Sequence, residues 1–191
     1  MYLLNRTIIP KIIQQFDNNL ILILIGARQA GKTHLLKLIE ANIKSEHPDN
    51  KVLYLNLEDE SLLLQIADYK NFLIFLKTQG VNGGHNKTFI LLDEFQKLPR
   101  PTKLLKLIYD NHPNLKIIAT GSSSLDIYKK MREESMAGRK RIFNVFPLSF
   151  NEFLSWQYPD LSKIFARIIE KNLDPSSISQ NFVLPFNEFT V

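Results

Sequence analysis

The stretch GARQAGKT, residues 26–33, directly follows the apolar run LILILI of residues 20–25. An apolar run without polar alternation is typical of a strand that is covered on both faces of a parallel sheet. The eight residues after it fit the spacing G-x-x-x-x-G-K-S/T. Glycine permits the dihedral angles and the close approach that a loop needs in order to turn its N–H groups toward a phosphate. The stretch therefore predicts a phosphate-binding loop between a strand and a helix.

Each residue type in this loop has a chemical reason. The helix after the loop presents unpaired amide groups and the positive end of its dipole to the same anion. Lys32 can reach the β- and γ-phosphates of a nucleotide, and Thr33 can ligate Mg²⁺ through its hydroxyl. The expected nucleotide contacts are Gly26, Ala27, Arg28, Gln29, Ala30, Gly31, Lys32, Thr33 and His34.

A pair of acids ends a second apolar run, in FILLDEFQ at residues 89–96. The carboxyl end of a buried strand is where open α/β sheets bind ligands. We expect Asp93 to hold Mg²⁺ through water and Glu94 to orient and deprotonate an attacking water. The alternative is that the two acids only cap the helix that follows. Beside a phosphate-binding loop, the catalytic interpretation is favoured.

A third strand ends in IIATGSSS, residues 117–124. If this strand lies between the strand at 20–25 and the strand before Asp93, a hydroxyl of Thr120 or Ser122 would face the γ-phosphate. That hydroxyl could hold the water or sense the phosphate, and the sequence does not say which residue does so. The alternative is that the serines cap the helix that begins at residue 125.

Three cations follow Gly138 in MAGRKR, residues 136–141. Arg139 could stabilise transition-state charge as an arginine finger, in its own subunit or in a neighbour of a homo-oligomer. The alternatives are a solvated basic loop, or a contact to the phosphate backbone of a nucleic acid. The loop from Arg139 to Arg141 is thus the candidate surface for a DNA or protein partner.

Short apolar runs alternate with segments of helical period along the chain. This alternation predicts an α/β fold, in which a three-layer domain has a mainly parallel five-stranded sheet. A turn and a short helix should occupy residues 147–158, with Ser149 as N-cap and Glu152 at the capping-box position. The expected strands are 20–25, 52–57, 88–92, 116–119 and a weaker one at 142–146, and the expected helices are 32–44, 61–77, 101–111, 125–133 and 161–172. Residues 174–191 show no clear period.

The composition limits the classes of protein. A length of 191 residues suffices for one domain with a proper core, and 45% hydrophobic residues is an ordinary globular share. A net charge of +5 and a pI near 9.3 weakly favour an anionic partner, such as nucleotide, nucleic acid or acidic protein. Cysteine is absent, and the apolar runs are too short to span a bilayer. We therefore expect a cytoplasmic protein with no membrane contact.

The order of these motifs resembles the AAA+-type predicted ATPases of archaea and bacteria that carry a C-terminal nuclease-like domain of unknown function. The matching segments are Arg6, GARQAGKT, NLEDE at 56–60, DEFQKLP at 93–99, TGSSS at 120–124, Gly138-Arg139 and PLSFNEFL at 147–154. The resemblance implies an ATPase domain over residues 1–158 with the sensor strand beside the central P-loop strand. Residues 159–191 would be part of a helical or winged-helix lid, or a linker to a C-terminal domain that the chain does not reach.

The sequence thus predicts an ATPase that hydrolyses Mg-ATP to ADP and phosphate, and so drives or gates a process directed at DNA or protein. Lys32 and the loop amides would stabilise the phosphates, Thr33 and Asp93 would hold the metal, and Glu94 would activate water. One alternative is a nucleotide-gated switch with little turnover that recruits DNA or a protein. A small-molecule kinase is the other, although no acceptor-binding lid is evident.

Overall fold

Five parallel strands form one sheet in the computed structural model, which describes residues 6–81, 86–122, 136–170 and 182–190. The strand order is β2-β3-β4-β1-β5. This arrangement confirms the α/β fold with a five-stranded parallel sheet, and it places β4 between β1 and β3. The strands are β1 Ile21–Gly26, β2 Lys51–Asn56, β3 Thr88–Asp93, β4 Leu115–Ser122 and β5 Lys140–Asn144.

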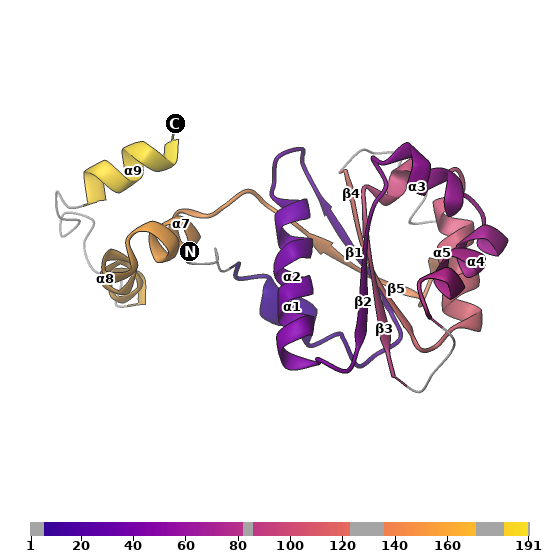
Figure 1. Cartoon of the computed structure of the whole chain (residues 1–191). Coiled ribbons are helices and arrows are strands. Elements are labelled where there is room, and N and C mark those ends of the chain that lie inside the picture. Colours follow the sequence, from indigo (N-terminus) through magenta and orange to yellow (C-terminus); the bar gives the residue numbers. More distant parts are fainter. Residues whose placement is uncertain (1–5, 82–85, 123–135, 171–181, 191) are drawn as a thin grey trace.

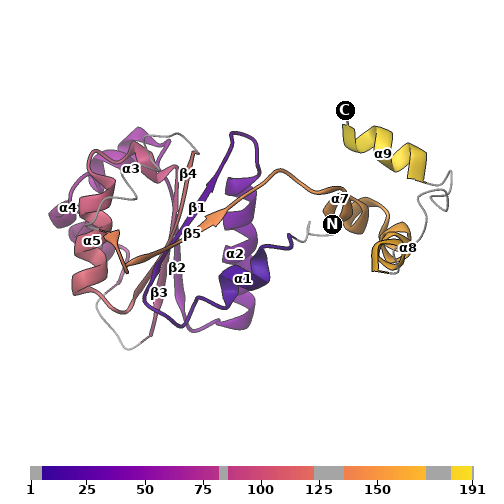
Figure 2. The ribbon, with the colours of Figure 1, turned by 180° about the vertical axis from the view of Figure 1, so that it is seen from behind.

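Helices cover both faces of the sheet, which makes the three layers (Figures 1 and 2). The short helix α1 (Ile9–Ile13) and the longer α2 (Lys32–Glu46) lie on one face. On the other face lie α3 (Glu60–Gln65), α4 (Tyr69–Thr78) and α5 (Pro101–Asn111). A 3₁₀ turn, η1 (Phe95–Lys97), follows β3. Among the described residues, no helix combines the length and apolarity needed to cross a membrane.

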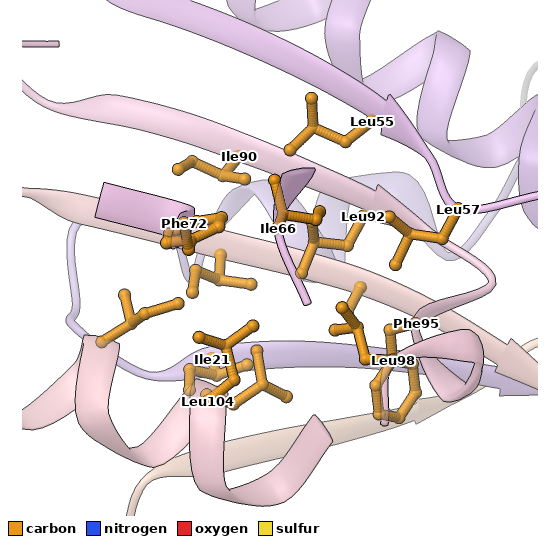
Figure 3. Packing of buried hydrophobic residues seen from close by; sticks show 14 of the residues in the cluster. Ile21, Leu55, Leu57, Ile66, Phe72, Ile90, Leu92, Phe95, Leu98 and Leu104 are labelled. Atoms are coloured by element: carbon orange, nitrogen blue, oxygen red, sulfur yellow. The ribbon is translucent and has the colours of Figure 1, made fainter. Parts of the chain in front are cut away.

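Alternate residues of β1 supply the two hydrophobic clusters of the domain. Ile21, Ile23 and Ile25 belong to the cluster on the α3–α5 side, whereas Leu22 and Leu24 belong to the cluster on the α2 side. Because both faces are covered, the strand is apolar at every position. Figure 3 shows the first cluster, which includes Phe72, Ile90, Leu92, Phe95 and Leu104.

The helix expected at residues 61–77 is in fact two helices, and that prediction was wrong. Asp59 caps α3 by accepting from the N–H groups of Ser61 and Leu62. Asp68 caps α4 by accepting from the N–H of Asn71. An aspartate at an N-cap stabilises a new helix start, and this local preference outweighs the continuous apolar period. The helix expected at 125–133 lies outside the described residues.

Three helices at the C-terminal side stand apart from the sheet, beyond α1 and α2 (Figures 1 and 2). They are α7 (Phe150–Gln157), α8 (Pro159–Glu170) and α9 (Val183–Thr190), the last in a segment without a clear period. The ring of Phe150 contacts the rings of Phe165 and Phe189 at centroid distances of 5.4 and 5.5 Å. The expected capping box of Ser149 and Glu152 is present. The domain boundary at 158/159 stays a prediction.

A buried lysine ties β4 to the segment that leads into β1. Lys116 is 1% exposed, and its ammonium donates to the carbonyl oxygens of Asn18 and Leu20, both at 2.7 Å, and to the Asn18 side chain at 3.0 Å. We expect Lys116→Met to lower the free energy of unfolding by about 2 kcal/mol, because the two carbonyls lose their donor. Urea denaturation measures this loss. Lys103→Met, at an exposed position of α5, is the control, and equal midpoints for the two variants would contradict the prediction.

Candidate functional site

The loop after β1 has the backbone geometry that its sequence predicts. Gly26 lies against Val145, the residue that follows β5, and a Cβ atom on Gly26 would come within 2.2 Å of the Val145 carbonyl oxygen. Gly31 has a φ of +82° at the N-cap of α2. A larger residue at either position would clash or would strain the backbone. The two glycines therefore allow the chain to leave β1 and to enter α2 through one tight loop.

Lys32 lies across this loop. Its side chain is 7% exposed, and its ammonium donates to the carbonyl oxygens of Gly26 at 3.1 Å and Ala27 at 2.9 Å. No carboxylate among the described residues forms an ion pair with it. The positive charge therefore lies inside the loop with only backbone dipoles as partners. Such a charge favours an anionic ligand at the same place.

A pocket of about 410 Å³ opens at the N-terminus of α2. It is lined by Arg28, Gln29, residues 31–34, Lys37 and Glu94. A larger depression of about 740 Å³ lies between α4 and the end of α5, beside Leu115 at the amino end of β4. Its walls are mainly apolar, with Leu73, Ile74 and Val81 among them. We take the smaller pocket as the candidate site, because it combines cations, loop amides and an acid.

Asp93, at the end of β3, is held by two hydroxyl groups. It is 2% exposed, and it accepts hydrogen bonds from the Thr120 hydroxyl and, at 2.9 Å, from the Tyr54 hydroxyl. Burial and the bond to Asp93 raise the pKa of Tyr54 well above its ordinary value, so Tyr54 stays a donor. Each Asp93 oxygen thus has one protein partner and keeps capacity for another.

Glu94 turns out of the strand toward the loop. Its φ of 58° is left-handed, and its N–H donates to the Thr120 hydroxyl oxygen at 3.1 Å. The Gln96 side-chain amide donates to the Glu94 carboxylate. The other atom of that amide, Oε1, is buried without a hydrogen-bond partner among the described residues. A side chain with a left-handed backbone at a pocket wall is a common feature of functional sites.

The two hydroxyl residues of β4, Thr120 and Ser122, lie in different parts of the site. Thr120 is fully buried and contacts Asp93 and the Glu94 backbone. Ser122 pairs in register with Gly26, and so it lies beside the start of the loop. The structure therefore brings Ser122 to the loop, and it brings Thr120 to the acids.

Arg139 lies far from the loop in the same chain. Its carbonyl accepts from the N–H of Ile21 at 2.9 Å, at the amino end of β1, while the loop follows the other end of β1. At about 3.3 Å per residue, the two ends are about 17 Å apart. The Arg139 side chain forms an ion pair with Asp110 at 2.8 Å. The structure does not bring Arg139 and the loop after β1 together within one chain.

Comparison with protein families gives a match over most of the chain. A family model described as an AAA domain matches residues 18–154. The chain belongs to this family. MJ1637, an uncharacterized protein of Methanocaldococcus jannaschii, is 34% identical over 139 residues, which are 72% of this chain and 28% of that protein. MJ1544 of the same organism is 29% identical over 170 residues, which are 89% of this chain and 35% of that protein. The chain spans about a third of the length of these curated relatives.

Solved structures share the fold of this AAA domain. C. elegans PCH-2 superposes with a TM-score of 0.51 and 17% identity, over 88% of this chain and 45% of that chain. The Aeropyrum pernix ORC1 protein, solved in complex with DNA, superposes with a TM-score of 0.50 and 17% identity, over 75% of this chain and 44% of that chain. At this identity, the likeness shows the fold of the AAA domain and nothing further.

Two polar residues of this AAA domain were missed by the sequence analysis. Tyr54 holds Asp93 from β2, and Gln96 holds Glu94 from η1. Gln96 follows Glu94 by two residues, so its closeness to Glu94 in the segment DEFQ was the only feature of the sequence that could have indicated this contact. Tyr54 is one aromatic position in the half-buried edge strand β2, and only the pairing of β2 with β3 reveals its role.

The donor set of the AAA domain fits a nucleotide with Mg²⁺. Thr33 in the first turn of α2 supplies a hydroxyl oxygen, and Asp93 supplies a carboxylate, both of which are hard ligands that Mg²⁺ prefers. Because both Asp93 oxygens already accept a hydrogen bond, the carboxylate suits a contact through water.

Proposed function

We propose that this AAA domain binds Mg-ATP at residues 26–34 and hydrolyses it to ADP and phosphate. The observation that carries the proposal is that Lys32 and Glu94 line the same pocket. The charge of Lys32 lies there inside the loop that Gly26 and Gly31 allow. Hydrolysis needs a site for the phosphates and a base within reach of water, and this pocket combines residues for both tasks.

The residues divide the work as follows. Lys32, the loop amides and the start of α2 bind the β- and γ-phosphates and stabilise negative charge on them. When bound, Mg²⁺ neutralises charge on the phosphate oxygens; Thr33 and Asp93 are the residues that would hold it. Glu94 accepts a proton from the attacking water, and Ser122 is the better placed hydroxyl to contact the γ-phosphate.

We further propose that hydrolysis serves a cytoplasmic process directed at DNA or protein. The basic loop from Arg139 to Arg141, at the start of the edge strand β5, is the candidate contact, and Arg139 would reach a phosphate only in a neighbouring subunit. The Aeropyrum pernix ORC1 protein, which shares the fold, was solved in complex with DNA, so DNA is the first of these two partners to test. The order of the motifs supports membership in the family with a nuclease-like C-terminal domain.

Calorimetric titration of the protein with Mg-ATP tests the binding step. We expect saturable binding with one nucleotide per chain, competition by ADP, and a weaker affinity when EDTA removes the Mg²⁺. Residues 86–89, NKTF, lack the aspartate of the guanine-reading motif N-K-x-D, so GTP should compete less well. The absence of any saturable signal up to millimolar ATP would refute the proposed function.

The two hydroxyls that hold Asp93 should differ in their effect on turnover. Thr120→Val removes the bonds to both Asp93 and the Glu94 backbone, whereas Tyr54→Phe removes only one bond to Asp93. We expect turnover to fall about 10-fold or more in Thr120→Val and about 3-fold in Tyr54→Phe, because Thr120 makes two of these bonds and Tyr54 makes one, and a typical hydrogen bond contributes about 0.5–1.5 kcal/mol net. Phosphate release at saturating Mg-ATP measures both. A larger loss in Tyr54→Phe than in Thr120→Val would contradict this assignment.

A further inference from the structure

A buried arginine joins the phosphate loop to the C-terminal helices. Arg6 is 5% exposed, and its guanidinium has three different partners. It donates to the Ala30 carbonyl oxygen at 3.3 Å, to the Phe146 carbonyl oxygen at 2.6 Å and to the Glu152 carboxylate at 3.3 Å. One side chain therefore contacts the loop, the segment after β5 and the first turn of α7 at once.

The contact between Arg6 and the Ala30 carbonyl determines the direction in which the N–H of Gly31 points. The C=O and N–H groups of a planar trans peptide point in opposite directions. Because Arg6 holds the Ala30 oxygen on its own side of the loop, the N–H of Gly31 is directed to the other side. Gly31 is also the residue with a φ of +82°, so the peptide before it would have freedom to rotate without this anchor. The guanidinium lies only 3.1 Å from the position that a Gly31 Cβ atom would take.

Glu152 in turn fixes Arg6. Its carboxylate, also 5% exposed, accepts from Arg6, from the Thr7 N–H at 2.8 Å and hydroxyl at 2.9 Å, and from the Ser149 N–H at 2.9 Å. Burial raises the pKa of this carboxyl, but the hydrogen bonds from Ser149 and Thr7 and the charge of Arg6 outweigh it and lower the pKa below its ordinary value. The group therefore remains ionised at neutral pH as the acceptor that holds the guanidinium.

A stability role alone does not account for this arrangement. A buried ion pair is weak evidence for stability, since apolar residues of similar volume often do as well. A pair needed only for packing would also not require the third partner, a carbonyl inside the phosphate loop. The arrangement instead transmits the position of α7 to the loop through one rigid, planar group.

We propose that Arg6 and Glu152 are positioning residues that orient the Gly31 amide for phosphate binding and couple nucleotide affinity to the docking of α7. This inference rests on the proposed function, since it concerns the same site. By linkage, a nucleotide that binds the oriented loop also stabilises the docked α7, and by the same factor. Helices α7–α9, which stand apart from the sheet, would thereby respond to the nucleotide (Figures 1 and 2).

Binding of Mg-ADP to Arg6→Met, Arg6→Lys and Glu152→Gln tests the inference, at a temperature where circular dichroism shows each variant folded. We expect Kd to rise about 10-fold or more in Arg6→Met, because a change of this size corresponds to the loss of one charge-assisted hydrogen bond. Arg6→Lys keeps the charge but cannot hold three partners, so its Kd should rise as well. Glu152→Gln should raise Kd about 3-fold or more. The double variant Arg6→Met/Glu152→Gln should bind no more weakly than Arg6→Met, because Glu152 acts through Arg6.

The controls separate this inference from a general loss of charge or fold. Arg167→Met and Glu170→Gln, at exposed positions of α8, should leave Kd unchanged. A wild-type Kd in Arg6→Lys would mean that only the charge matters, and a wild-type Kd in Glu152→Gln would mean that no coupling exists; each would overturn the proposal. If Arg6→Met does not fold, the Lys and Gln variants still decide it.

Hydrogen exchange measures the coupling in the reverse direction, as the effect of bound nucleotide on α7. Saturating Mg-ADP should slow exchange of the α7 amides in the wild type, and much less in Glu152→Gln, whereas a merely structural pair predicts no nucleotide effect on α7 in either protein. If the wild type binds nucleotide, but the Arg6 and Glu152 variants bind equally well, only this inference fails. If the wild type binds none, the proposed function fails first.

Discussion

Lys32→Ala is expected to weaken binding of Mg-ATP by about 100-fold or more. The lysine supplies a buried positive charge inside the loop, and its partners in the structure are only the carbonyls of Gly26 and Ala27. Charge-assisted bonds to a phosphate in so enclosed a place are among the strongest that a side chain can make. Fluorescence titration with a labelled ATP analogue, competed with Mg-ATP, measures the change in Kd.

The fold should survive this change, since alanine has high helix propensity at the first position of α2. Lys44→Ala is the matched control, because Lys44 lies on the same helix and pairs with Glu40 at the surface. It should bind Mg-ATP with the Kd of the wild type. A Kd for Lys32→Ala within about 3-fold of the wild type would show that phosphates bind elsewhere.

Glu94→Gln is expected to separate binding from turnover. The substitution keeps the size of the side chain but removes its ability to take a proton from water. A general base typically contributes about 10²–10⁴-fold, so the turnover number should fall within that range while Kd for Mg-ATP changes less than about 3-fold. Equilibrium titration and steady-state phosphate release, on the same preparation, give the two numbers.

The matched control is Glu60→Gln, an exposed acid in the first turn of α3 that the structure places away from the pocket. It should retain both the wild-type turnover number and the wild-type Kd. Hydrolysis by Glu94→Gln at the wild-type rate would remove Glu94 from the proposed role. Loss of binding together with loss of turnover would instead assign Glu94 to the binding of nucleotide.

The strands could be predicted because their physics is local. A strand covered on both faces is apolar along its buried length, as β1 is and as β3 is between Thr88 and Asp93, so their positions follow from the sequence within one residue. The break between α3 and α4 was missed since the apolar period continues through it. The N-cap of Asp68 begins α4 as a separate helix, just as the N-cap of Asp59 begins α3.

Some parts of the candidate site could be predicted and others could not. Its loop and its acids follow from short motifs, because neighbouring residues share one turn or one strand end. The residues that hold the loop and the acids in place do not follow from such motifs. Tyr54 contacts Asp93 across 39 positions of sequence, and Arg6 contacts Glu152 across 146. Such pairs arise from strand order and from the packing of distant segments, neither of which a local pattern contains.

The central claim is that the loop, Asp93 and Glu94 form a complete ATPase site. Steady-state release of phosphate from Mg-ATP by the wild-type chain tests it most directly, with EDTA and Lys32→Ala as blanks. We predict turnover that depends on Mg²⁺, saturates with ATP and disappears in both blanks. Mg-ATP that binds without any release of phosphate above the blanks would contradict the claim, and would identify the chain as a nucleotide-gated switch.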